Sequence, residues 1–180
     1  MSETRETLAE DAREGEVKYL REVFLFKGLT DEQLSEILSV ANLVKVPAGH
    51  IFIKEANKGD SLYVIREGEV EVSRSLTIPL QLLSSTRQEK ALSRLSDRDR
   101  AVFGEMVLFN EQTRSATVRC LTDCSFYELK KEAFLKLAEQ HVEIGYHLFK
   151  NLAQMVSERL RRSTDDVVKL ATALSIAIGR

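Results

Sequence analysis

Residues 103–118, FGEMVLFNEQTRSATV, combine side chains that could hold an anion with one that could accept hydrogen bonds from a sugar. Gly104 has no Cβ atom, so the backbone there can approach a ligand closely. Arg114 follows nine residues after Glu105, and its planar guanidinium group suits two oxygens of a phosphate. Ser115 can donate one further hydrogen bond to the same group. This stretch therefore predicts a phosphate-binding site.

The neighbouring residues extend this predicted site. The carboxylate of Glu105 only accepts hydrogen bonds, which suits a ribose hydroxyl better than a phosphate. Ala116 is small enough to leave space for a ligand, and Met106 begins the short apolar run after Glu105. If residues 104–109 form one or two helical turns, the free N–H groups at their start attract an anion. The simpler interpretation is a helix cap followed by a strand, with the glutamate compensating the helix dipole.

Catalytic and metal chemistry have less support. His141 and His147 are six residues apart, a spacing that does not place them on one face of a helix, and His50 lies beside a turn. Cys120 and Cys124 fall in a strand-like stretch, where a cysteine pair without further ligands is typical of core filling. The sequence also shows no Ser-His-Asp or Cys-His set. We therefore expect no enzyme activity, no metal and no cofactor apart from a bound ligand.

The bulk composition narrows the class of protein. The chain has 180 residues, of which 43% are hydrophobic and 30% charged, as expected for one folded domain. A net charge of −2, from 26 basic and 28 acidic residues, gives no overall attraction to nucleic acid. No apolar run approaches the roughly 20 residues of a membrane-spanning helix, and the acidic N-terminus is unlike a signal peptide. We expect a cytoplasmic protein without membrane contact.

Residues 1–45 are expected to form an N-terminal helical segment, with helix from about residue 4 to residue 44. In the stretch GLTDEQLSEILSVA, Thr30 and Gln33 occupy the positions of a capping box. The apolar residues that follow share one helix face, at Leu34, Ile37, Leu38 and Ala41. This face should dock on the next part of the chain.

Residues 46–131 have the pattern of short strands. Turn signals at 47–49, 57–60 and 67–68 separate β-rich segments at 51–53, 62–65 and 70–72, and further strands are expected at 116–120 and 124–129. Strands at intervals of about 8 to 12 residues are typical of an antiparallel barrel or jelly roll. The predicted fold class is therefore mostly β with flanking helices, and the segment 103–117 belongs to the barrel.

A long excursion interrupts this pattern at residues 76–100. Pro79 breaks any strand there, and the sequence from Ser84 to Lys90 is polar and charged. We expect a surface loop, with Ala91 to Leu95 returning to the sheet. A lid or a partner contact is the open alternative, because long loops in compact domains are often functional.

Residues 132–180 are predicted to be helical. The stretch KEAFLKLAEQ forms one amphipathic helix, and the remainder carries two apolar stripes, Ile144, Leu148, Leu152 and Met155, then Val167, Leu170, Leu174 and Ile178. A single long helix cannot bury both stripes against a small barrel, so we expect it to pack against its copy in a twofold dimer. The alternative is two shorter helices, broken at Ser163-Thr164, that both fold on the barrel.

Residues 103–117 resemble the phosphate-binding cassette of cyclic nucleotide-binding domains, especially those of bacterial catabolite activator (cAMP receptor) proteins. The family pattern is F-G-E, an aliphatic residue, a small residue and L, then R-S/A-A/T after a variable segment. It is matched here by Phe103-Gly104-Glu105-Met106, Leu108 and Arg114-Ser115-Ala116-Thr117. The barrel frame is similar too, at Pro47, Gly49, Gly59-Asp60, Leu62-Tyr63-Val64 and Gly68. The similarity extends from about Phe24 to the last helix and implies the cyclic nucleotide-binding fold.

The resemblance also implies a role for each matching residue. Glu105 and the backbone of Gly104 would hold the ribose 2′-hydroxyl, while Arg114 and Ser115 would bind the cyclic phosphate. In activator-type dimers the long helix offers a Thr-Ser pair to the adenine, one residue from each subunit. The expected ligand-binding residues are therefore Gly104, Glu105, Met106, Arg114, Ser115, Ala116, Ser163 and Thr164.

The function implied by this resemblance is a non-catalytic regulatory sensor in signal transduction. It would bind cAMP, and cGMP less readily, and signal as a homodimer through the C-terminal helix to an unknown downstream protein. Val107 stands where the family usually has a smaller residue and, with the long excursion, favours an alternative: a binding-incompetent domain acting as a dimeric interaction module.

A second alternative is the sensor fragment of a transcription regulator. In the activators a helix-turn-helix domain follows the long helix, whereas this sequence ends at Gly179-Arg180. We therefore expect no direct nucleic-acid binding by this chain. The cluster Arg159, Arg161 and Arg162 is interpreted as a solvated helix face.

Overall fold

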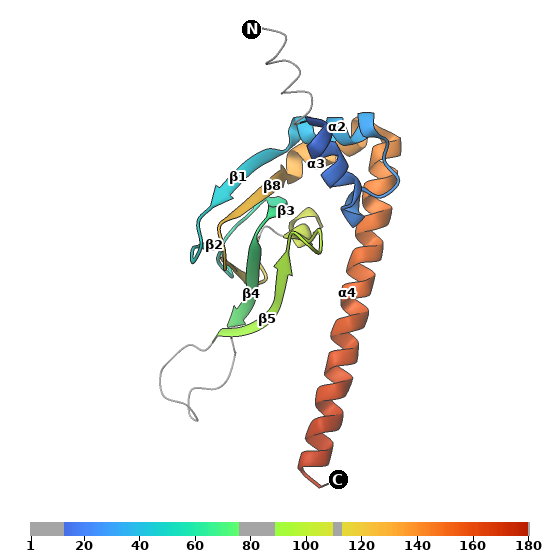
Figure 1. Cartoon of the computed structure of the whole chain (residues 1–180). Helices are drawn as coiled ribbons and strands as arrows, with labels where there is room; N and C mark the ends of the chain where they lie inside the picture. Colours follow the sequence, from blue (N-terminus) through green and yellow to red (C-terminus); the bar gives the residue numbers. More distant parts are fainter. Residues whose placement is uncertain (1–12, 76–88, 110–112, 180) are drawn as a thin grey trace.

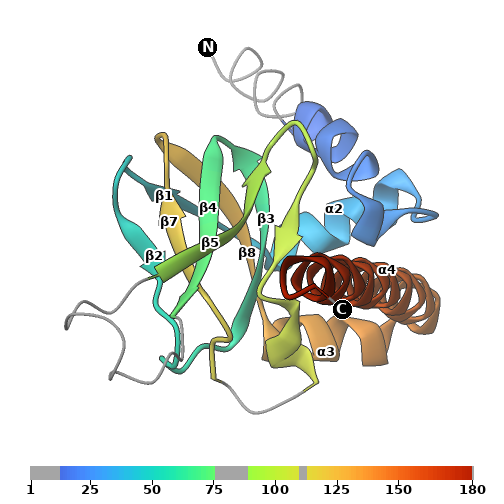
Figure 2. The ribbon, with the colours of Figure 1, turned by 90° about the horizontal axis from the view of Figure 1, so that it is seen from below.

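The computed structural model describes residues 13–75, 89–109 and 113–179 (Figure 1). Two four-stranded antiparallel sheets face each other, with strand orders β1-β8-β3-β6 and β2-β7-β4-β5. The strands are β1 (Asn42–Val46), β2 (Ile51–Ile53), β3 (Ser61–Glu67), β4 (Glu69–Ser75), β5 (Glu89–Ser96), β6 (Val102–Phe103), β7 (Thr117–Cys120) and β8 (Cys124–Lys130). This arrangement confirms the predicted jelly roll, and Figure 2 shows the helices gathered on one side of it.

The N-terminal segment consists of a helix at residues 13–21, a 3₁₀ turn, η1 (Phe24–Phe26), and helix α2 (Asp31–Val40). The predicted capping box is confirmed, because the Thr30 hydroxyl accepts from the Gln33 N–H and the Gln33 side chain accepts from the Thr30 N–H. The expected helix over residues 42–44 is wrong. Ala41 is already extended, and residues 42–46 pair with β8 along their whole length. The part of the predicted helix before residue 13 lies outside the described residues.

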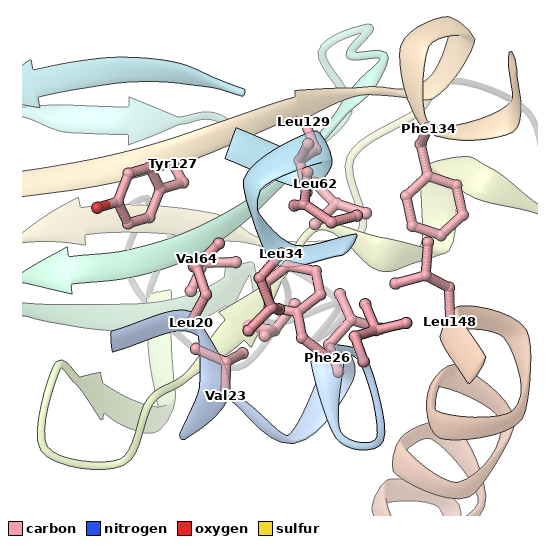
Figure 3. Close-up of a cluster of buried hydrophobic side chains, with 14 of the residues drawn as sticks. Leu20, Val23, Phe26, Leu34, Leu62, Val64, Tyr127, Leu129, Phe134 and Leu148 are labelled. Atoms are coloured by element: carbon pink, nitrogen blue, oxygen red, sulfur yellow. The ribbon is translucent and has the colours of Figure 1, made fainter. Parts of the chain in front are cut away.

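Two apolar clusters hold the layers together. One lies between the two sheets and includes Ile65, Val118 and Phe126. The other joins the helices to the sheet that contains β3 and β8, with residues such as Leu20, Phe26, Leu34, Leu62, Leu129, Phe134 and Leu148 (Figure 3). Alternate residues of β3 and β8 therefore serve different clusters, as the period of two in a strand requires.

The C-terminal segment contains α3 (Lys131–Gln140) and α4 (Val142–Ala177). α4 is one continuous helix of 36 residues, so the alternative of a break at Ser163-Thr164 is wrong. The Thr164 hydroxyl donates to the Leu160 carbonyl, which satisfies this side chain inside the helix. The first predicted stripe is buried against the domain, whereas the second lies along the exposed part of α4 that runs past the barrel in Figure 1.

The base of α4 is fixed to the N-terminal segment. The buried side chain of Asn151 donates to the carbonyl oxygens of Leu25, at 3.0 Å, and Lys27, at 2.8 Å. At Gly145, an added Cβ would lie 2.6 Å from the Ala138 carbonyl oxygen, so the glycine permits the close approach of α3. α4 is therefore anchored in its first half, while its second half is exposed.

The structure also bears on the predicted excursion at residues 76–100 and on the question of a membrane-spanning helix. Ala91 to Leu95 belong to β5, as expected, while residues 76–88 of the long excursion lie outside the described residues. Within the described ranges, no helix is long and apolar enough to cross a membrane.

Candidate functional site

A cavity of about 350 Å³ lies between residues 103–107, residues 113–116, the strands β2, β4, β5 and β7, and α4. Side chains from β2, β4, β5 and β7 form its apolar wall, among them Ile53, Val72, Leu95 and Val118. Six of the eight predicted ligand-binding residues line it: Gly104, Glu105, Met106, Arg114, Ser115 and Ala116. The structure therefore brings the predicted cassette together around one cavity.

Gly104 begins the cassette with a left-handed backbone. Gly104 has a φ of 79° and lies between β6 and η2 (Glu105–Leu108), a helical turn of the kind considered for residues 104–109. An added Cβ would lie 2.9 Å from Nη1 of Arg114 and 3.0 Å from the Ser61 carbonyl oxygen. Both the φ angle and the lack of space therefore require glycine here.

Arg114 is the buried cation of the cavity. The residue is 8% exposed, and its Nη1 donates to the Ser61 carbonyl oxygen at 2.8 Å. Its guanidinium carbon lies 5.5 Å from the centre of the Tyr63 ring. Among the described residues, no carboxylate forms an ion pair with Arg114 within 4.0 Å. A buried charge without a counter-ion is costly, so this site favours an anionic ligand.

Gly59, in the β2–β3 loop, leaves the space that the Arg114 side chain occupies. A Cβ at this position would lie 2.1 Å from Nε of Arg114, so Gly59→Ala should push the guanidinium from its place. We expect a weakened anion site, with about tenfold lower ligand affinity for a loss of about 1.4 kcal/mol. Titration calorimetry measures this change. The matched control is Gly15→Ala, where an added Cβ meets nothing within 4 Å and binding should be unchanged. Equal affinities for both variants would contradict this role of Gly59.

Glu105 is also buried, at 6% exposed, but it has a charged partner, Arg159, which the sequence suggested to be a solvated residue. Nη1 of Arg159 lies 2.6 Å from Oε1 of Glu105, and Nη2 of Arg159 donates to the Val102 carbonyl. Arg159 also lines the cavity, so it is not a simply solvated residue of α4. No local pattern links two residues that are 54 positions apart. The sequence contains only an indirect indication: Arg159 lies one helical turn before Ser163, a predicted ligand-binding residue.

The other two arginines of the cluster behave differently. Arg161 and Arg162 hydrogen-bond to Glu158, and together, Arg161 first, they lower the pKa of this carboxyl group to about 2. Both side chains are largely exposed, as predicted, although Arg162 also reaches the cavity wall. α4 therefore contributes two arginine residues, Arg159 and Arg162, to the cavity wall.

Val107, the unusually large cassette residue, is 2% exposed and lines the cavity. Other residues of the cavity wall are less buried than Val107. Ser115 is exposed at the cavity wall, Ala116 is half-buried, and Met106 is 48% exposed.

Ser163 and Thr164 are placed away from this site. Both are exposed on α4, and neither lines the cavity of its own chain. The prediction takes one residue of the pair from each subunit. The contact expected within the same subunit is not seen in this cavity wall, and the contact across a dimer is part of the proposal below.

Cys120 and Cys124 are free, buried thiols of the barrel core, as predicted. Burial first, and then the neighbouring Cys124, raise the pKa of Cys120 to about 12, so this thiol is a poor nucleophile. Within the described ranges, no group of three or more His, Cys, Asp and Glu side chains could hold a metal ion.

Comparison with known proteins identifies the family. The pattern of the cyclic nucleotide-binding domain matches residues 43–141, more than half of the chain. The chain is 35% identical over 109 residues to cGMP-dependent protein kinase, isozyme 1, of Drosophila melanogaster, an alignment that covers 61% of this chain and 13% of the kinase.

Solved structures show the same likeness. The catabolite activator protein of Thermus thermophilus aligns with a TM-score of 0.69 and 27% identity, over 82% of this chain and 63% of that one. The regulatory domain of Toxoplasma gondii PKA, in a co-crystal structure with cAMP, aligns with a TM-score of 0.60 and 25% identity, over 71% and 45%. This chain thus spans less than two thirds of each of these relatives. With its matching fold and cassette, the chain belongs to the cyclic nucleotide-binding domain family.

Proposed function

We propose that this chain is a non-catalytic sensor whose cavity binds a cyclic nucleotide, with cAMP preferred to cGMP. The observation that carries this proposal is Arg114, a buried guanidinium group on the cavity wall without a carboxylate partner among the described residues. A cyclic phosphate supplies the missing negative charge and accepts two hydrogen bonds from this group. Ser115, exposed beside it, donates a further one.

The sugar end of the ligand is assigned to Glu105. A carboxylate accepts the hydrogen bond of the ribose 2′-hydroxyl, and Arg159 offsets its charge so that it does not repel the phosphate. The backbone of Gly104 lies close to the same point because no Cβ intervenes. Met106 and Ala116 line the space around it.

The preference for cAMP rests on the ligand of one similar structure. The Toxoplasma domain, which aligns with 71% of this chain, was crystallised with cAMP. Relatives named for cGMP also match this chain, over 61% of its length for the Drosophila kinase and over 82% for cGMP-dependent protein kinase egl-4 of Caenorhabditis elegans. The comparison of cAMP with cGMP in the melting experiment below therefore decides the preference.

α4 is proposed to carry the signal. It is anchored at Asn151, and two turns later Arg159 contacts the cassette through Glu105. A ligand that competes for Glu105 changes this contact and shifts the population of α4 orientations, which an unknown downstream protein reads. The two free thiols agree with a reducing compartment, and we place the sensor in the cytoplasm.

A second copy of the chain is the proposed partner of α4. Exposed residues follow an alternating four-three spacing along the whole helix, at Val142, Tyr146, Phe149, Ala153, Val156, Leu160, Ser163, Val167, Leu170, Leu174 and Ala177. This is the a/d pattern of a coiled coil, and we call these residues the α4 seam. The seam includes three residues of the second predicted stripe, while Ile178 lies just beyond it.

The seam also explains the Ser163-Thr164 pair. Ser163 occupies a seam position, whereas Thr164 flanks the seam on the side opposite to Arg159. In a parallel two-stranded coiled coil, flanking residues five positions apart on the two chains face each other, so Arg159 faces the partner's Thr164. Thr164 is therefore assigned to the partner's cavity.

Thermal melting with cAMP, cGMP and linear AMP tests the proposed function. A cyclic nucleotide at 100 times its Kd should stabilise the domain by about 2.7 kcal/mol. For a domain of this size, this corresponds to a rise in Tm of roughly 5 to 11 °C. Linear AMP should give a smaller shift, because its second phosphate charge and free 3′-hydroxyl do not match one guanidinium group. The absence of a shift with both cyclic nucleotides would favour the binding-incompetent alternative, for which Val107 is the supporting observation.

A further inference from the structure

Four residues form one row across the sheet β1-β8-β3-β6. Asn42 of β1 pairs with Glu128 of β8, Glu128 pairs with Tyr63 of β3, and Tyr63 pairs with Phe103 of β6. Residues directly opposite each other in antiparallel strands project from the same face. The row therefore runs from the end of the N-terminal helical segment to the residue just before Gly104.

The side chains of the row are linked from end to end. The Tyr63 hydroxyl donates to Oε1 of Glu128 at 3.1 Å, and Nδ2 of Asn42 donates to Oε2 of the same carboxylate at 3.4 Å. The Tyr63 ring stacks on Phe103, with centroids 5.4 Å apart and planes inclined by 27°. Burial, and then the charge of Glu128, raise the pKa of Tyr63, so its hydroxyl stays a donor. The ring is thus held at its edge by a hydrogen bond and on its face by stacking.

The cassette rests on this ring. The guanidinium carbon of Arg114 lies 5.5 Å from the Tyr63 centroid, within the range of a cation–π contact. An added Cβ at Gly104 would lie 3.5 Å from Cδ2 of Tyr63. The ring of Tyr63 therefore contacts the arginine of the proposed phosphate site and lies beside its glycine.

We propose that Tyr63 is a positioning residue of the anion site: its ring supports the guanidinium group of Arg114, and Glu128 fixes the ring. This inference rests on the proposed binding of a cyclic nucleotide. Because Arg114 lacks a carboxylate partner among the described residues, the ring and the Ser61 carbonyl are its identified supports. Tyr63 orients the cation without neutralising it, which leaves its charge available to the phosphate.

Phe52 is the matched control for this inference. The centroid of its ring lies 4.8 Å from that of Tyr63, 6.4 Å from that of Phe103 and 4.6 Å from that of Phe126, so Phe52 belongs to the same aromatic group. Phe52 is half-buried. It differs from Tyr63 because the cation–π contact of Arg114 is made with the Tyr63 ring. Phe52→Leu and Tyr63→Leu therefore both disturb the barrel core, but Tyr63→Leu also removes the support of Arg114.

The test is a double-mutant cycle between positions 63 and 114, read as the calorimetric Kd for cAMP. Tyr63→Leu should weaken binding about tenfold in the wild-type background and less than about threefold in an Arg114→Ala background, which has no cation for the ring to support. Phe52→Leu should change Kd by the same small factor in both backgrounds. Tyr63→Phe, which keeps the ring, should retain affinity within about threefold. If Tyr63→Leu does not fold, Tyr63→Met replaces it in the cycle.

Equal effects of Tyr63→Leu in both backgrounds would show that Tyr63 acts only through the stability of the core. A second measurement separates this inference from the proposed function. In the ligand-free protein, the ring current of Tyr63 should shift the Arg114 side-chain proton resonances in the NMR spectrum. This shift should persist in Tyr63→Phe and disappear in Tyr63→Leu. A wild type that binds no cyclic nucleotide would refute the proposed function, while an Arg114 shift that survives Tyr63→Leu would refute the role of Tyr63.

Discussion

Arg114→Ala is expected to weaken cAMP binding about 100-fold. The substitution removes the charge-assisted hydrogen bonds to the cyclic phosphate, which together contribute about 3 kcal/mol, and about 1.4 kcal/mol corresponds to each factor of ten. The cAMP affinity of Arg114→Lys should lie between those of Arg114→Ala and the wild type, because an ammonium group keeps the charge but lacks the planar pair of donors. Titration calorimetry of the three proteins measures the effect.

The ligand-free stability of Arg114→Ala distinguishes a lost contact from a damaged fold. Arg114 is buried and has no ion pair among the described residues, so its removal also removes a desolvation cost. The melting temperature without ligand should therefore stay close to that of the wild type. Arg119→Ala is the control, because Arg119 lies on β7, donates to the Gly49 carbonyl at 3.0 Å and is not part of the cavity wall. Undiminished cAMP affinity of Arg114→Ala would refute the assigned phosphate position.

Val167→Asp is expected to dissociate the proposed dimer, whereas Val168→Asp should leave it intact. The two valines are adjacent on α4 and similarly exposed in the single chain, at 62% and 59%. Val167 belongs to the α4 seam, and Val168 lies outside it. In a parallel coiled coil, Val167→Asp places two carboxylates opposite each other in an apolar interface, at a cost of several kcal/mol. The dimer Kd should rise at least about 100-fold.

Sedimentation equilibrium over a range of protein concentrations measures this pair of variants. Both substitutions introduce the same residue into the same turn of the helix, so their effects on helix propensity cancel in the comparison. Circular dichroism of each variant reports any loss of helix. Equal dissociation of both variants, or a wild type that stays monomeric at high micromolar concentration, would refute the α4 seam as the dimer interface.

Much of the fold follows from local sequence patterns. The capping box at Thr30 and Gln33 and the turn signals between short strands predicted elements that the structure contains. The strand β1 was missed because residues 42–46 follow a helix without a strong break, and their strand structure depends on pairing with β8, far along the chain. Pairing partners distant in sequence outweigh a weak local preference.

The cassette was predictable because its residues are close together in the sequence. Gly104, Glu105, Arg114 and Ser115 lie within one short segment, so their spacing alone indicates that they can surround one ligand. The contact of Glu105 with Arg159 had no such signal, because it joins the cassette to a helix that begins after the barrel is complete. The position of Ser163 on the α4 seam could be counted in sequence only once the helix was known to be continuous.

The sequence by itself determined the residue types of the anion site, the period of the strands and the apolar repeat of the last helix, because each of these is encoded between near neighbours. The tertiary structure alone decided that Arg114 is buried without a carboxylate partner among the described residues, that Arg159 pairs with Glu105, and that Tyr63 lies beneath the guanidinium group. Burial and ion pairing depend on which distant segments meet when the two sheets close and α4 docks, and the strength of a charge depends on that environment.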